Sequence, residues 1–245
     1  MDRTALTRMR ELAVTERSEL DRLLDETLIA HVGLRNGAGD VMVVPTALAR
    51  DGDSVLVHGS TGSGGSGWMR RAASGQAVCV TVTALDGIIV ARSAFESSFR
   101  YRSAVLFGAF TPVPESGKRS ALRTITERIL PGRSAEVREP LAREIAATLV
   151  LRMPITGWSM KVSDGWPADD DDDVARSAWA GVIPFGRPAR EPPLPAPDLR
   201  PGIPCPPSSS IRDRDDRSRP LRSGLTRGDP VLAIQMGSRV IQMPR

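Results

Sequence analysis

The stretch from Val55 to Gly108 decides the fold: VLVHGSTGSGGSGWMRRAASGQAVCVTVTALDGIIVARSAFESSFRYRSAVLFG. It places strand-like runs rich in Val, Ile and Thr on both sides of a glycine-rich loop. Three such runs follow one another before this loop, at residues 27–34, 41–49 and 54–58. Only short turns rich in Asn, Asp and Gly separate them. Parallel strands need a crossover of a dozen residues or more, so these turns predict antiparallel pairing.

The remaining segments divide into helical and strand-like patterns. Helical spacing of apolar residues is found at 15–26, 68–74, 115–130 and 140–149. Further strand-like runs are found at 77–90, 103–113 and 150–162. The helices do not alternate with the strands, which argues against a doubly wound sheet. The expected fold class is therefore mainly β (α+β), an antiparallel sheet or barrel with peripheral helices.

The aromatic residues set the expected domain boundaries. All ten lie between Trp68 and Phe185, so we expect one folded domain over residues 1–185, with 179–185 packing back on its body. Residues 186–207 form a proline-rich segment that should run extended. Residues 208–245 are rich in Arg, Asp and Ser, have no aromatic residue, and are expected to be disordered.

Charge and composition exclude several classes of protein. The net charge is +4, and eight Arg and four Asp in residues 208–245 account for all of it. A neutral body lacks the basic surface that nucleic-acid binding needs. The N-terminus has no apolar signal region and no window has about 20 apolar residues, so we expect no membrane span and a cytoplasmic location. Two cysteines and an uninterrupted run at Asp169–Asp173 predict no metal site.

The glycine-rich loop at residues 59–67 has two chemical interpretations. Gly62, Gly64 and Gly67 match the G-x-G-x-x-G pattern of dinucleotide-binding folds. The following helix is too short for a βαβ crossover, and the neighbouring strands form hairpins, so we reject that interpretation. A phosphate cradle of hydroxyls and backbone N–H groups and a flexible surface loop both remain open.

The ordered series of motifs carries a resemblance to a known family. The string from Val55 to Gly108, followed by PGRSAEVREP, SMKVSDGWPADD, WAGVIPF and PDLRPGIPCPP, resembles the pyridoxamine 5′-phosphate oxidase-like superfamily. The similarity is greatest to its flavin-nucleotide-binding and nitroimidazole-resistance-like branch and covers roughly residues 15–206. The resemblance implies a six-stranded antiparallel split β-barrel that binds FMN at a homodimer interface.

The resemblance also implies which residues contact the cofactor. One strand would line the flavin ring, the glycine-rich loop and the next helix would surround the phosphate, and a further strand would lie opposite. The implied residues are Val44, Pro45, Thr46, His58, Gly59, Ser60, Thr61, Ser63, Arg70, Arg102, Ser103 and Lys161. This chain departs from its relatives at Gly64–Gly67, which are inserted, and at Glu96–Arg100, which lack the usual histidines.

Three functions remain open at this point. No acid–base constellation is visible, which fits a protein whose cofactor carries the redox chemistry. The first hypothesis is an FMN-dependent oxidoreductase acting on an unknown small-molecule substrate. The alternatives are a flavin or haem carrier without turnover and an F420-dependent reductase on the same barrel. His31, in the first strand, is expected to be a core or interface residue.

Overall fold

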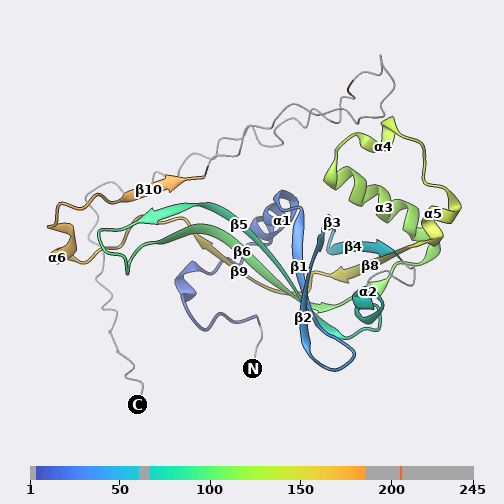
Figure 1. The fold of residues 1–245 in the computed structure, drawn as a ribbon, viewed down its shortest axis with the longest axis horizontal. Coiled ribbons are helices and arrows are strands. Elements are labelled where there is room, and N and C mark those ends of the chain that lie inside the picture. The colour runs from blue at the N-terminus through green and yellow to red at the C-terminus, as the bar shows by residue number, and fades with distance from the viewer. Residues whose placement is uncertain (1–3, 61–66, 186–204, 206–245) are drawn as a thin grey trace. The chain divides into compact units, whose positions relative to one another are not determined.

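The computed structural model describes residues 4–60, 67–185 and 205 (Figure 1). The predicted proline-rich segment, apart from Cys205, and the predicted disordered tail lie outside these residues, as do Thr61 and Ser63. The helices are η1 (Arg10–Leu12, 3-10), α1 (Arg17–Glu26), α2 (Gly67–Ala72), α3 (Glu115–Ile129), α4 (Arg133–Glu136), α5 (Ala142–Ala146) and α6 (Asp171–Val174). The strands are β1 (Ile29–Arg35), β2 (Val41–Ala47), β3 (Ala49–Asp51), β4 (Ser54–Ser60), β5 (Ala77–Val90), β6 (Ser98–Ala109), β7 (Thr111–Pro112), β8 (Thr148–Pro154), β9 (Gly157–Ser163) and β10 (Gly181–Pro184).

The described strands form two antiparallel sheets. The larger has six strands in the order β2-β1-β5-β6-β9, and β10 pairs with the far end of β5. The smaller has four strands in the order β3-β4-β8-β7. No pairing between described strands joins the two sheets, so the barrel is split. The predicted α+β class and antiparallel split barrel are confirmed.

The core lies between the two sheets. Alternate residues of each strand point into it because side chains of a strand alternate between faces. Helix α1 covers the opening with Leu20, Leu23 and Leu24, which are fully buried and share one face as the sequence predicts. Helix α3 covers the other face of the smaller sheet, where Ala121 and Ile125 pack against Leu56 and Val150. Apolar burial on this scale is the main stabilising term of the fold. The large core residues include Val32, Val55, Val57, Val80, Leu106, Phe110, Leu151, Met153 and Met160.

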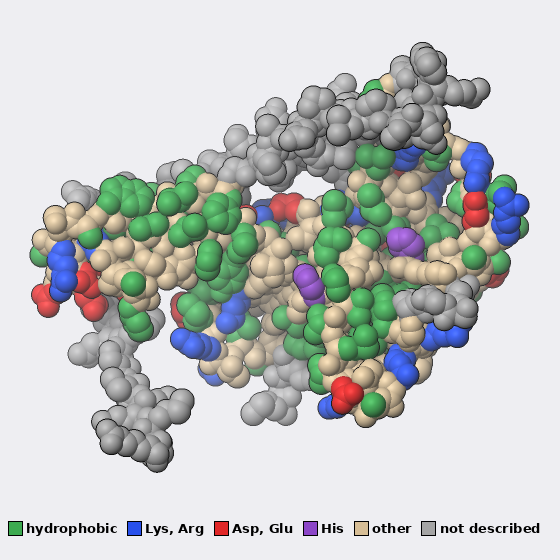
Figure 2. Space-filling view, in the orientation of Figure 1, with side chains coloured by type: hydrophobic (Ala, Val, Ile, Leu, Met, Phe, Trp, Pro, Cys, Tyr) green, Lys and Arg blue, Asp and Glu red, His purple; other side chains and the backbone are tan. Residues whose placement is uncertain are grey.

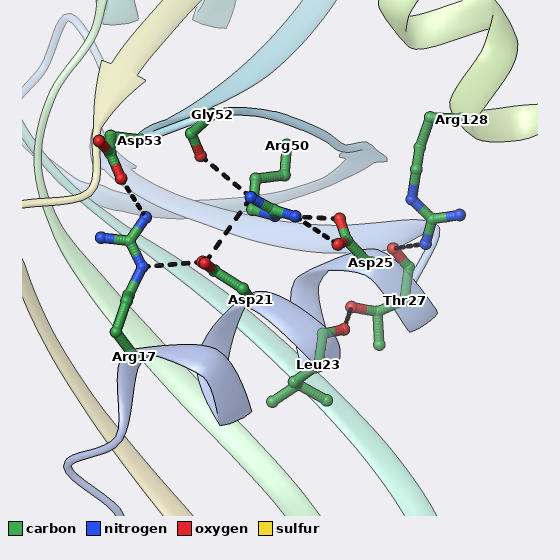
Figure 3. A network of polar contacts seen from close by, with 9 residues as sticks. All are labelled: Arg17, Asp21, Leu23, Asp25, Thr27, Arg50, Gly52, Asp53 and Arg128. Atoms are coloured by element: carbon green, nitrogen blue, oxygen red, sulfur yellow. Dashed lines mark hydrogen bonds and ion pairs between the residues drawn. The ribbon is translucent and has the colours of Figure 1, made fainter. Parts of the chain in front are cut away.

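A polar network fastens α1 to β3 (Figure 3). The Arg50 guanidinium donates to both carboxylate oxygens of Asp25, at 3.0 and 2.5 Å. Arg17 donates to Asp21 at 2.7 Å and to Asp53 at 3.0 Å. The hydrogen bond to Asp25 raises the pKa of Arg50. Charge-assisted pairs of this kind set the position of α1 more than they add stability.

The expected helix at 140–149 and the expected strand at 150–162 are corrected by the structure. Helix α5 ends at Ala146, and β8 takes the following residues because they pair with β4. The strand then ends at Pro154, whose ring removes a backbone donor. The next strand, β9, joins the other sheet by pairing with β6. The segment 148–163 is therefore two strands in two sheets.

In the hairpin of β5 and β6, β5 has the bounds that the sequence predicts, whereas β6 begins and ends earlier than predicted. The expected strand at 103–113 begins five residues earlier, at Ser98, and a β-bulge interrupts the register between Leu85 and Gly87. Beyond the bulge the hairpin projects past β1 and β9 and is joined by β10 (Figure 1). We call residues 85–100 together with 164–185 the arm. No described helix is long and apolar enough to cross a membrane.

Candidate functional site

The outer face of the larger sheet carries one group of predicted cofactor residues. The register places Pro45, His31, Thr81, Val105 and Ser159 side by side across five strands. Pro45 and His31 are exposed and the other three are half-buried. This row combines a flat apolar ring, an imidazole and two hydroxyls on a rigid surface. We call these five residues the platform.

Strand alternation separates Val44 and Thr46 from their neighbour Pro45. Val44 packs against the hydrophobic core, and Thr46 is on the same side of β2. Of the three predicted residues on this strand, only Pro45 presents its side chain to the platform. The side chains of Val44 and Thr46 point away from this surface, so their contact with a cofactor stays a prediction.

Ser103 and Lys161 are brought together beside the platform. They are register partners on β6 and β9, and the Nζ of Lys161 donates to the Arg8 carbonyl at 2.8 Å. This bond helps tie the N-terminal segment along the edge of β9. Between that segment and β9 lies a cavity of about 490 Å³, a volume in the range of small-molecule pockets. Its lining includes Leu6, Arg10, Val14, Trp158, Ser159 and Met160.

Arg102 lies on the opposite face of the sheet from Ser103. Its guanidinium donates to both Asp86 oxygens at 2.9 Å and to a Glu26 oxygen at the end of α1. The hydrogen bonds to Asp86 and, to a smaller extent, to Glu26 raise the pKa of Arg102. Two carboxylates thus already accept hydrogen bonds from the guanidinium that the family resemblance assigned to the cofactor. Its cofactor role stays a prediction, and these contacts argue against it.

A second group lies at the end of β4. His58, Gly59 and Ser60 pair with the first residues of β8. The Nδ1 of His58 is buried and has no hydrogen-bond partner among the described residues. Burial lowers the pKa of this imidazole, so it is neutral at neutral pH. A buried unpaired polar atom costs about 1–3 kcal/mol, which makes His58 the side chain in this group that most needs a ligand.

Arg70 follows this group on α2, whose Met69 and Ala72 are buried in the core. The next residue, Arg71, lies against Gly37 in the β1–β2 turn, where any larger side chain would collide with its guanidinium. The side chain of Arg71 is therefore directed to the β1–β2 turn, and the predicted phosphate contact of Arg70 stays a prediction. Thr61 and Ser63 belong to the same predicted cradle but fall outside the described residues, so the cradle's shape stays a prediction.

Sequence reasoning missed the platform as a unit. It named Pro45 but assigned His31 to the core or an interface, and it gave Thr81 no role. The missing signal is strand register, because a residue's cross-strand neighbours depend on pairing that a single strand does not reveal. Both histidines of the chain are visible on one face of the molecule (Figure 2), in different sheets. No group of three or more metal-ligating side chains is found among the residues that the structure describes.

Comparison with known proteins decides the family. The family model for pyridoxamine 5′-phosphate oxidase matches residues 16–162. The chain belongs to the pyridoxamine 5′-phosphate oxidase family. The resemblance found in the sequence is thereby confirmed, and the match spans the barrel from α1 to β9. It ends before α6 and β10, so part of the arm lies beyond the family model.

Three solved structures show the range of relatives. A FAD and heme binding protein from Mycobacterium smegmatis is 47% identical, with a TM-score of 0.76, over 80% of this chain and 95% of that one. The flavocytochrome Anf3 from Azotobacter vinelandii is 36% identical, with a TM-score of 0.78, over 85% of this chain and 95% of that one. A putative 5-nitroimidazole antibiotic resistance protein from Bacteroides thetaiotaomicron shares the fold. It is 18% identical, with a TM-score of 0.50, over 61% of this chain and 86% of that one. A search of curated proteins gave no match.

Proposed function

We propose that this protein is a flavin-binding redox protein that also binds haem. The observation that carries the proposal is the 47% identity to a FAD and heme binding protein, over 95% of that protein's length. The similarity to a flavocytochrome supports the same pair of cofactors. The predicted haem carrier and the predicted flavoprotein then become one molecule rather than alternatives. F420 binding stays a prediction.

The flavin in this proposal is FAD rather than the predicted FMN, because the Mycobacterium smegmatis relative is named for FAD. The platform fits a planar ring, since Pro45 presents a flat apolar ring next to His31 at this surface. The hydroxyls of Thr81 and Ser159 and the His31 imidazole supply hydrogen-bonding groups at that surface. A bound flavin supplies hydride or electron transfer, while the protein binds and orients it.

His58 is the proposed haem ligand. Haem iron in proteins is commonly held by a histidine, and the imidazole must be neutral to coordinate a metal. His58 is neutral because burial lowers its pKa, and its Nδ1 lacks a partner among the described residues. His31, the other histidine of the chain, is exposed on the platform. We assign it to the flavin surface.

The first experiment identifies the cofactors. The full chain is expressed in cells supplied with a haem precursor, and its absorption spectrum is recorded before and after dithionite. We expect flavin bands together with a Soret band that shifts on reduction. Chromatography of the released flavin should give FAD. A colourless protein that binds neither added FAD nor added haemin would overturn the proposal, and release of FMN would correct the flavin alone.

The second experiment uses the two histidines as matched variants. His58→Ala should remove the Soret band and leave the flavin bands, while His31→Ala should keep the Soret band and weaken flavin binding. Haemin titration of the purified proteins gives the same comparison without relying on expression. If His31→Ala loses haem and His58→Ala keeps it, the two assignments are reversed and the platform is the haem site.

A further inference from the structure

The N-terminal segment at residues 4–15 lies along β9, the last strand of the larger sheet (Figure 1). The backbone N–H of Val14 donates to the Met160 carbonyl at 3.1 Å, and the Nζ of Lys161 donates to the Arg8 carbonyl at 2.8 Å. The cavity of about 490 Å³ lies between this segment and the strand. Hydrogen bonds therefore hold its two walls together.

The cavity has mainly apolar walls. Trp158 and Met160 line it from β9, and Leu6 and Val14 line it from the N-terminal segment. Met160 is buried and Trp158 packs against the hydrophobic core, so the interior of the protein holds the β9 wall in place. Indole rings stack with other aromatic rings, and methionine sulfur makes favourable contacts with ring edges. The lining therefore favours a ligand with a flat aromatic body.

Arg10 is the one charged residue in the described lining, which contains no Asp or Glu. Its side chain is exposed, so it lies at the opening of the cavity. The Nε of Arg10 donates to the Leu6 carbonyl at 3.0 Å, which holds the guanidinium beside the wall. A guanidinium has further N–H donors, and those of Arg10 meet no carboxylate among the residues that the structure describes. One positive charge at the opening is complementary to a ligand with a single carboxylate.

The backbone before Arg10 has an uncommon conformation. Met9 has φ 53° and ψ 52°, in the left-handed region, and is the one non-glycine residue with a positive φ in the described part of the chain. Such conformations cost free energy and are concentrated at functional sites such as ligand clamps. The turn at Met9 begins η1, so it sets the position from which Arg10 reaches the opening.

We propose that this cavity binds a small aromatic carboxylate. The ring lies between β9 and the N-terminal segment, and the carboxylate accepts hydrogen bonds from the Arg10 guanidinium. The hydroxyls of Thr15 and Ser159, which also line the cavity, are further donors for the ligand. An apolar cavity of this volume with a few polar groups is the usual form of a small-molecule site.

The proposed site includes a part of the chain that the family model does not cover. The family match begins at residue 16, so the wall formed by residues 4–15 lies outside it. Ser159 belongs both to the cavity and to the platform, so a bound ligand lies beside the surface proposed for the flavin. Binding itself needs neither flavin nor haem. The proposal therefore stands or falls independently of the proposed function.

The test is isothermal titration calorimetry of the full chain, without added cofactor, with naphthoate as the probe. The neutral naphthalenemethanol is the matched ligand, and it should bind roughly five- to tenfold more weakly because it lacks the charge-assisted hydrogen bonds. Arg10→Met should weaken naphthoate binding by the same factor and leave naphthalenemethanol unchanged. Arg8→Met is the matched control and should change neither, since Arg8 is outside the lining and its carbonyl still accepts from Lys161.

A second variant, Ala13→Phe, tests the cavity itself. Ala13 lines the cavity and forms a backbone bridge with Lys161. A phenylalanine ring at this position should fill the space without breaking the bridge, and should abolish binding of both probes. Decanoate has the same carboxylate on a flexible chain and should bind more weakly than naphthoate, because it gains no ring stacking.

Four results would overturn the proposal. They are no binding of naphthoate at millimolar concentration, binding that neither Arg10→Met nor Ala13→Phe weakens, an equal loss in Arg8→Met, and tighter binding of decanoate than of naphthoate. Circular dichroism checks that each variant is folded. If Ala13→Phe does not fold, the different response of the two naphthalene probes to Arg10→Met decides alone.

Discussion

The near and far halves of β5 and β6 are the same two strands in different surroundings. Near the barrel, Val80 and Leu106 are fully buried under the opposite sheet and α1. In the arm, the same side of the hairpin is still buried at Ile89, which is 6% exposed, but the other side leaves Phe99 51% exposed although the strands are paired there as well. Regular pairing alone therefore does not bury a strand, and burial depends on whether another layer lies over that side. The following predictions test this difference, in order of expected effect.

The largest effect is expected in the barrel core. Leu106→Ala removes a fully buried side chain and should lower the free energy of unfolding by about 2–5 kcal/mol. Leu85→Ala, at the base of the arm, is the matched control, since Leu85 is 56% exposed and should cost less than about 1 kcal/mol. Urea denaturation of dilute protein measures the free energy of unfolding of both variants. Equal losses would mean that the arm is packed as tightly as the barrel.

The ion cluster at the junction of barrel and arm should give the next effect. Arg102→Met leaves the carboxylates of Glu26 and Asp86 without the cation that both contact. It should lower the free energy of unfolding by about 2–3 kcal/mol. The loss is below that of a fully buried pair because the Asp86 side chain is 40% exposed.

Arg100→Met controls for loss of a guanidinium, since its described contacts are a carbonyl and the Trp166 ring. The Arg100→Met variant should lose about 1 kcal/mol or less of its free energy of unfolding. Thermal unfolding of the two variants gives the comparison. A larger loss for Arg100→Met would place the main anchor in the arm.

A smaller and purely local effect is expected at Gly87. A Cβ built there would lie 2.7 Å from the Ile183 carbonyl oxygen, so Gly87→Ala should force β10 away and lower its local opening free energy by about 1–3 kcal/mol. Hydrogen exchange of the Val182 and Ile183 amides reports this opening. Gly165→Ala is the control, because its Cβ meets open space. Global stability should hardly change in either variant, and a global loss would show that the arm and the barrel unfold together.

The smallest effect is a pH dependence on the barrel's surface. The side chain of Ser134 and the backbone N–H groups of Gly132 and Ser134 hydrogen-bond to Glu127 and lower its pKa from 4.5 to about 2. The stabilisation is complete above pH 4.5 and is lost as the pH falls through about 2.

Glu127→Gln should therefore narrow the difference in melting temperature between neutral and acid conditions. The change should be less than about 2–4 °C, because this side chain is only partly buried and solvent screens its charge. Glu139→Gln is the control, because it removes only an exposed ion pair with Arg119. An unchanged pH profile in Glu127→Gln would show that this cap adds nothing to stability.

Much of the fold follows from the sequence because its signals are local. The turns between β1, β2 and β4 and the leucine face of α1 depend on residues close in the chain. The boundary errors at 140–162 have a tertiary cause, since β8 is fixed by its pairing with β4 and not by its own propensity. The early start of β6 and the pairing of β10 were missed for the same reason, since β10 lies some 90 residues from its partner strand β5.

The candidate site was less predictable than the fold. A motif names consecutive residues such as Arg102 and Ser103, but a strand sends them to opposite faces. The carboxylates that hold Arg102 come from α1 and from the bulge of β5, and no local pattern connects them. His58 was found by its place before the glycine-rich loop, whereas its unpaired Nδ1 becomes visible only once the neighbouring strands are in place.

The β-bulge at Asp86 shifts the alternation of side chains between the two faces of β5. Asp86 is the one residue by which β5 exceeds its partner across the hairpin, since Leu85 faces Tyr101 and Gly87 faces Arg100. Because of this extra residue, Leu85 and Gly87 lie on opposite faces of the sheet although they are two positions apart in the chain. Removing Asp86 would keep Ile88 opposite Phe99 and Ile89 opposite Ser98, and would therefore straighten β5 without exchanging the arm's two faces. The identity of these faces is fixed by the pairing with β6 and not by the numbering along β5.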